Sequence, residues 1–192
     1  MKSVRTMLPA CAVLGLLVLV GSTGDAAASR PAIFTTHTGD ADVYVNPLLA
    51  RAHPEARYLP LVIGVVNNDA TPVQLTRNSF SIEYGGTVHR AVTVAELRRH
   101  YTKLDFDARQ IRQMNMVRIL GLNAIKPVPS NFYPIIRKNS AVTTEIVELP
   151  RRYDMWDVLY FKRPAGLRPG ATFTVRVTAT GWAKPVAVTV TL

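Results

Sequence analysis

The residues best suited to chemistry in this sequence are cations gathered in one segment. Residues 97–140 contain nine lysines and arginines but only two acidic residues. Arg109 and Arg112 are three positions apart, so a helix would place them on one face. Guanidinium groups bind phosphates and carboxylates through paired hydrogen bonds. We therefore select an anion- or partner-binding set, which consists of Arg98, Arg99, Arg109, Arg112, Arg118, Arg137 and Lys138. The alternative is a solvated basic face that keeps the protein soluble.

The histidines and carboxylates form no recognisable metal motif. No two histidines lie two to four positions apart, which disfavours a local metal-binding pair. We expect solvated or capping roles for all four, which are His37, His53, His89 and His100. Asp40 with Asp42, and Asp105 with Asp107, match only the beginning of a calcium loop, and we interpret Asp107 as a helix cap. The sequence therefore predicts neither a metal nor another cofactor.

Short catalytic motifs are also absent. The sequence contains no Gly-x-Ser-x-Gly, Ser-x-x-Lys, His-Glu-x-x-His, Walker or Gly-x-Gly-x-x-Gly pattern. We therefore predict that the protein is not an enzyme. The alternative is an exported hydrolase whose site combines histidines and aspartates that are distant in sequence. That alternative requires a cleft in which a histidine comes within reach of a carboxylate or a hydroxyl.

Residues 1–28 have the parts of a secretory signal peptide. A short basic start precedes an apolar run without charge over Met7–Val20, and Ala26–Ala28 supplies the small residues that a signal peptidase requires. We predict cleavage after Ala28 and export to the periplasm, the cell surface or the outside of the cell. Two alternatives are an uncleaved membrane anchor and a lipoprotein modified at Cys11.

The composition excludes several classes of protein. The chain has 192 residues, of which 48% are hydrophobic and 19% charged, and it has a net charge of +10 and one cysteine. It is too apolar for a disordered chain. One cysteine can form neither a disulfide framework nor a cysteine-based zinc site. We expect residues 29–192 to form a single domain. Export and the lack of a recognised module argue against a nucleic-acid partner.

Alternation of apolar and polar residues predicts a mainly β domain. It is clearest in 171–179 and 186–192, which Gly181–Pro185 would join as a hairpin. Tyr58–Val66 is apolar on both faces, as expected of a central strand. We predict about seven or eight strands in total. The others are Val43–Val45, Phe80–Tyr84, Val88–Val92, Trp156–Phe161 and part of Val142–Leu149.

Helices and a proline-rich connection are predicted to interrupt the strands as an insert over residues 93–140. Thr93 and Glu96 form a capping box at the start of a short helix. A second, weaker box begins at Asp107, and Gly121 is a natural end for the helix that follows. Long irregular connections are more often functional than other segments. The insert is therefore the first place to look for function.

Several short motifs resemble secreted immunoglobulin-like modules of bacteria. They are Tyr58–Asn67, Pro72 with Val73, Phe80–Glu83, Tyr160 with Phe161, and Leu167–Gly170 before the final alternating strand. In those modules one strand ends at an asparagine and the next begins at a phenylalanine. The resemblance implies an extracytoplasmic immunoglobulin-like β-sandwich, in a family of mostly unassigned function, and it implies no catalytic residue. The helical insert departs from a plain sandwich.

Together these features predict an exported, non-enzymatic module. We expect it to bind a protein partner or an anionic envelope component through its basic insert, and to touch a membrane only at the surface. A further alternative is a structural subunit of a surface appendage or a secretion assembly. The oligomeric state is left open.

Overall fold

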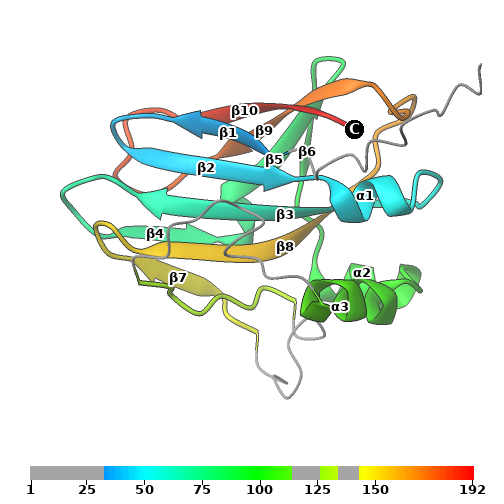
Figure 1. The fold of residues 1–192 in the computed structure, drawn as a ribbon, viewed down its shortest axis with the longest axis horizontal. Helices are drawn as coiled ribbons and strands as arrows, with labels where there is room; N and C mark the ends of the chain where they lie inside the picture. Colours follow the sequence, from blue (N-terminus) through cyan, green and yellow to red (C-terminus); the bar gives the residue numbers. More distant parts are fainter. Residues whose placement is uncertain (1–32, 114–125, 134–142) are drawn as a thin grey trace, which may run out of the picture.

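The computed structural model describes residues 33–113, 126–133 and 143–192 (Figure 1). The predicted signal peptide lies outside these residues, and so do Gly121, Arg118, Arg137 and Lys138. Within the described ranges the protein is mainly β, with antiparallel sheets and a few short helices. No helix in these ranges is long and apolar enough to cross a membrane.

Ten strands and three α-helices are present in the described part of the chain. The strands are β1 (Phe34–His37), β2 (Ala41–Asn46), β3 (Tyr58–Asn67), β4 (Val73–Thr76), β5 (Phe80–Tyr84), β6 (Thr87–Arg90), β7 (Ile146–Leu149), β8 (Asp154–Lys162), β9 (Thr172–Val177) and β10 (Val186–Thr191). The helices are α1 (Leu48–Ala52), α2 (Val94–His100) and α3 (Leu104–Gln113). One sheet has the order β1-β2-β3-β8, a second has the order β10-β9-β5-β6, and β4 pairs with β7. All of these pairings are antiparallel.

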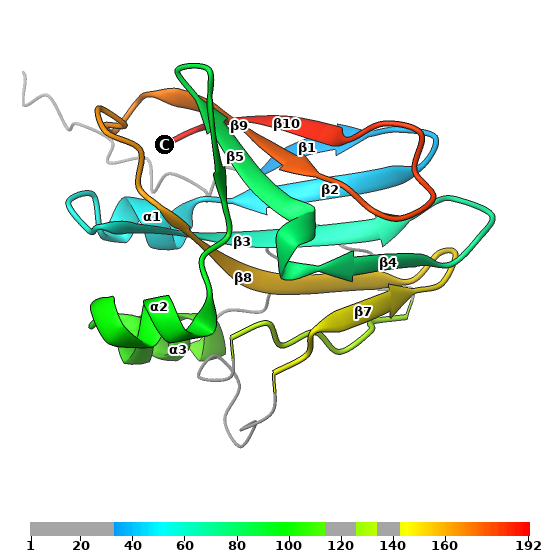
Figure 2. The ribbon, with the colours of Figure 1, turned by 180° about the vertical axis from the view of Figure 1, so that it is seen from behind.

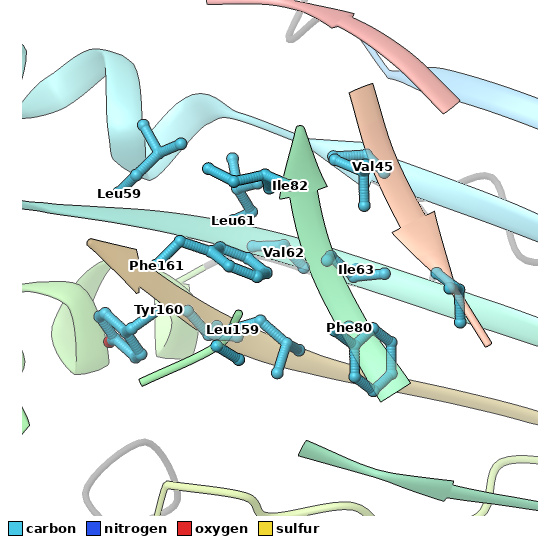
Figure 3. Packing of buried hydrophobic residues seen from close by; sticks show 14 of the residues in the cluster. Val45, Leu59, Leu61, Val62, Ile63, Phe80, Ile82, Leu159, Tyr160 and Phe161 are labelled. Carbon is cyan, nitrogen blue, oxygen red and sulfur yellow. The ribbon is translucent and has the colours of Figure 1, made fainter. Parts of the chain in front are cut away.

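The two four-stranded sheets pack against each other around an apolar core. Leu61 and Ile63 of β3 meet Phe80 and Ile82 of β5, and Phe161 of β8 lies beside them (Figure 3). These five side chains are fully buried. Burial of this apolar surface is the main favourable term in the folding free energy. The core explains why strands from both ends of the chain come together.

Most of the predicted strands are confirmed. β3 is central, between β2 and β8, and nine of its ten residues are buried. β9 and β10 form the predicted hairpin, and β5 and β6 flank Gly85 and Gly86, which both adopt positive φ. The sequence does not predict β1, β4 or α1. β1 has one apolar residue in four and β4 has two, which do not define a period, and α1 has only five residues, too few to show a helical period.

Asn67 fixes the end of β3. Its side-chain nitrogen donates to the carbonyl oxygens of Thr71 and of Leu149, at 2.9 Å in both cases. Its side-chain oxygen accepts from the backbone nitrogen of Asp69 at 3.0 Å. The side chain is fully buried with these bonds satisfied, as a buried polar group requires. One residue therefore ends the strand and joins it to β7.

The helices α2 and α3 lie side by side, at the same end of the sheets as α1 (Figures 1 and 2). Figure 2 also shows how the short turn at Arg77–Ser79 carries the chain from β4 to β5. Both helices belong to the predicted insert, between β6 and β7. We call α2, α3 and the residues between them, 94–113, the helical unit.

Candidate functional site

Capping and apolar spacing position the helical unit. The Thr93 hydroxyl accepts a hydrogen bond from the Glu96 amide at 3.1 Å, which confirms this half of the predicted capping box. The Glu96 carboxylate accepts instead from the Tyr58 hydroxyl at 3.3 Å. The buried side of the unit is formed by Leu97, Leu104, Ala108 and Ile111. These residues turn one side of each helix toward the sheets.

Four of the selected cations are exposed on the helical unit. Arg98 and Arg99 on α2, and Arg109 and Arg112 on α3, are all exposed. Among the described residues, none of the four forms an ion pair with a carboxylate. Four guanidinium groups are thus open to solvent on two neighbouring helices, which we call the arginine surface. The other three selected residues lie outside the described ranges.

The interpretation of Asp107 as a helix cap is wrong. α3 begins three residues earlier, at Leu104, so Asp107 lies inside its first turn. Residues 104, 107, 108 and 111 form one stripe at helical spacing, and all four are buried. The side chain of Asp107 therefore points inward, and the residue is fully buried. In the sequence, the signal for this burial is the position of the Asp107 carboxylate within an otherwise apolar stripe at helical spacing.

Two tyrosine hydroxyls hold the buried carboxylate. Tyr101, which follows α2, donates to Asp107 Oδ2 at 2.8 Å, and Tyr160 of β8 donates to the same oxygen at 3.2 Å. Hydrogen bonds to a charged acceptor are stronger than those between neutral groups. Asp107 thus links α3 to the end of α2 and to the sheet. Sequence reasoning missed this contact because Tyr160 is far away along the chain.

His53 faces the other carboxylate oxygen. Its Nε2 lies 3.5 Å from Asp107 Oδ1, and only 14% of its side chain is exposed. Neither atom has a hydrogen bond. The ring also packs edge-to-face on Phe106, with 4.7 Å between centroids. Of the two roles expected for the histidines, solvated or capping, His53 does not have the first, whereas the second fits its position as the C-cap residue that follows α1. By contrast, His37 is 63% exposed and pairs with Asp42 at 3.0 Å.

The two tyrosines that donate to the carboxylate belong to a row of four tyrosine rings. The centroids of Tyr58 and Tyr101 are 5.6 Å apart, those of Tyr101 and Tyr160 are 5.5 Å apart, and those of Tyr160 and Tyr133 are 5.0 Å apart. All three contacts are edge-to-face, which is a favourable geometry for aromatic pairs. Tyr133 in turn donates to the carbonyl of Val92 at 2.6 Å. Tyr101 and Tyr160, whose hydroxyls hold Asp107, are therefore themselves held in a packed row of rings.

Arg163 holds the turn that carries His53. Its Nε donates to the Ala56 carbonyl at 2.8 Å, and its Nη2 donates to the His53 carbonyl at 2.9 Å. A cation near the last carbonyls of a helix is also favoured by the helix dipole. Burial lowers the pKa of this guanidinium, but arginine remains charged in proteins. The chain after β8 therefore fixes the backbone position of the histidine.

Burial sets the protonation of the pair. It raises the pKa of Asp107 to about 6, although the two tyrosine hydrogen bonds oppose the shift. The pKa of His53 is lowered, first by burial and then by the charge of Lys103. Attraction between a carboxylate and an imidazolium would act in the opposite direction on both groups. At 3.5 Å without a hydrogen bond, we take desolvation to be the larger effect.

His53 connects the buried pair to the surface. Together with Ala52, Pro54, Glu55, Ala56 and Lys103 it lines an open hollow of about 350 Å³. Asp107 does not line this hollow, so His53 is the outer member of the pair. An imidazole with a carboxylate behind it can accept a proton from a bound molecule or from water. The geometry thus supplies a histidine near a carboxylate beside a hollow.

Comparisons of the chain with protein-family models, with curated proteins and with solved structures find no match.

Proposed function

We propose that the protein is an exported, non-enzymatic binding module that recognises an anionic component of the cell envelope through its arginine surface. The observation that carries the proposal is the exposure of Arg98, Arg99, Arg109 and Arg112 without a carboxylate partner among the described residues. Guanidinium groups left unpaired on neighbouring helices suit phosphates and carboxylates of a ligand. Export is supported by the signal-like sequence of residues 1–28.

We further propose that the fold is immunoglobulin-like. In immunoglobulin domains the second strand pairs with the fifth in one sheet, while the third, sixth and seventh pair in the other. Here β3 pairs with β8 in one sheet, and β5 pairs with β9, which pairs with β10, in the other. This order supports the proposal if β3, β5, β8, β9 and β10 correspond to strands B, C, E, F and G. The helical unit then interrupts the segment before strand E.

The binding proposal is tested by retention of the protein on vesicles. We expect retention on vesicles that contain phosphatidylglycerol, weak retention on pure phosphatidylcholine, and a decline with added salt. Arg109→Ala with Arg112→Ala should reduce retention by about thirtyfold, because each cation near an anionic surface contributes about 1 kcal/mol.

The control removes two exposed cations at the other end of the sheets. Arg151 lies in the turn between β7 and β8 and Lys184 in the loop between β9 and β10, far from the helical unit (Figure 1). Arg151→Ala with Lys184→Ala changes the net charge by the same amount and should leave most of the retention. Equal losses in the two double variants would show that only overall charge matters. No retention at low salt would rule out an anionic lipid partner.

The pair of His53 and Asp107 favours a second candidate, an exported hydrolase. His53 would accept the proton of a water molecule, which then attacks an ester carbonyl, and the proton would pass to the leaving alkoxide. The test is hydrolysis of a panel of ester substrates by the protein, by His53→Ala and by the control His89→Ala. Activity that is lost only with His53 would support the enzyme. Equal activity in all three proteins would assign it to a contaminant.

A further inference from the structure

One carboxylate joins four elements that are distant in sequence. Asp107 belongs to α3, Tyr101 follows α2, Tyr160 belongs to β8 and His53 follows α1. α3 also carries Arg109 and Arg112 on its exposed side. The contacts that hold Asp107 in place therefore also fix the position of the arginine surface.

One contact of the Asp107 carboxylate lacks a hydrogen bond. Asp107 Oδ1 and His53 Nε2 face each other at 3.5 Å, both are buried, and neither has a hydrogen bond. If the histidine is neutral with its proton on Nδ1, two acceptors face each other. One added proton, on either atom, converts this contact into a hydrogen bond. The geometry therefore favours the binding of a proton.

The surrounding groups limit the pair to a single proton. Tyr101 and Tyr160 stabilise the carboxylate, whereas burial disfavours its charge. Lys103 opposes a positive charge on His53. Farther away, Arg163 lies near Tyr101, Glu55 lies near Arg163, and Glu96 of α2 accepts from Tyr58. With cations on the imidazole side, a second proton on the pair is unfavourable.

We propose that His53 and Asp107 form a proton-binding clasp, in which uptake of one proton seats the helical unit on β8 and α1 and so strengthens anion binding by the arginine surface. The first part stands by itself, and the second part rests on the proposed function. A seated, preorganised surface binds more tightly because less ordering is required on binding.

The sign of the effect follows from the two protonation states. The pKa of Asp107 is about 6 in the folded protein and 3.8 for an ordinary aspartate. The folded state therefore binds the proton more tightly than the unfolded state, and acidification toward pH 5.5 favours the seated helical unit. At lower pH, protonation of His53 opposes seating, because its pKa is lowered in the folded state. Seating is therefore strongest in mild acid.

Hydrogen exchange of the backbone amides of α3 tests the first part. With rates corrected for the intrinsic effect of pH, exchange in the unaltered protein should be about fivefold slower at pH 5.5 than at pH 7.5. Asp107→Asn keeps the shape but cannot titrate, so its protection should be the same at both pH values. His53→Gln provides a second variant with a weakened dependence. Equal pH dependence in the protein and in both variants would overturn the clasp.

Retention on phosphatidylglycerol vesicles tests the second part. The parent protein and the Asp107→Asn variant are both compared in the His100→Gln background, because His100 is an exposed histidine in the last turn of α2, beside the arginine surface. The parent should bind about fivefold more tightly at pH 5.5 than at pH 7.5, and the Asp107→Asn variant should show little change. The same increase in both proteins would overturn the coupling. Slower exchange without retention at either pH would confirm the clasp and exclude the lipid partner.

Discussion

The contact between the two sheets and the contact around Asp107 beneath α3 are both buried in the protein, but they are built from different groups. Between the sheets, Leu61, Ile63, Phe80 and Ile82 form a purely apolar contact (Figure 3). Beneath α3, the fully buried Asp107 is surrounded by tyrosine hydroxyls and a histidine. The apolar contact depends on burial and packing and contains no group that titrates, whereas the polar contact depends on where its proton resides. The comparison separates what stabilises the fold from what can respond to a signal.

The largest effect is expected from opening a cavity between the sheets. Phe80 is fully buried and packs on Phe132, with 5.9 Å between ring centroids. Phe80→Ala should lower the free energy of unfolding by about 3–5 kcal/mol, because apolar burial is lost and a cavity remains. Denaturant unfolding at pH 5 and at pH 7.5 measures the loss. A loss that differed strongly between the two pH values would contradict the separation of the regions.

Asp107→Asn should act in the opposite direction. At pH 7.5 the buried carboxylate is charged, and the difference between a pKa of about 6 and the ordinary 3.8 corresponds to an upper limit of about 3 kcal/mol. The variant should gain up to that amount at pH 7.5 and nothing below pH 4. This is because the stabilisation from proton binding is complete below pH 4 and is lost as the pH rises through 6. Thermal unfolding of both proteins between pH 4 and pH 7.5 measures this difference. A variant that is less stable than the unaltered protein at pH 7.5 would contradict the prediction.

Tyr101→Phe should show the strength of one hydrogen bond to the buried charge. It removes the donor at 2.8 Å from Asp107 Oδ2 and leaves the ring in place. We expect a loss of about 1.5–3 kcal/mol at pH 7.5, because hydrogen bonds to charged groups are the stronger kind. The loss should be smaller at pH 4.5, where the carboxyl is protonated. The pKa of Asp107, followed by NMR, should rise, because Tyr101 lowers it. An unchanged pKa would show that the contact is not formed in solution.

The smallest of these effects is expected at the N-terminal start of the helical unit. Thr93→Ala removes the acceptor of the Glu96 amide at the start of α2. Such a change lowers stability by about 1 kcal/mol. Thr93→Ser keeps the hydroxyl and should restore most of the loss. A similar loss in both variants would assign the effect to the methyl group instead of the cap.

The two regions also differed in how well the sequence predicted them. The strands of the core follow from alternation over six residues, as in β9 and β10, or from a continuous apolar run, as in β3. The contacts of Asp107 could not be predicted, because Tyr160 and His53 reach it only after β8 and α1 are in place. The sequence prediction places the start of this helix at the capping box of Asp107, but α3 begins before it, at Leu104. Local spacing identifies a buried face, but it does not identify what that face meets.

The pairing of β3 with β8 also has a consequence for the order of folding. Tyr58 pairs with Lys162 and Val66 with Asp154, so the chain must close a long loop before this ladder forms. Contacts between distant residues slow folding, because loop closure comes before the stabilising contacts. Tyr160 belongs to the same ladder, and until it arrives the carboxylate of Asp107 is open to water. We therefore expect the charge to lose its hydration late in folding, so that alkaline conditions slow the final step more than the early ones.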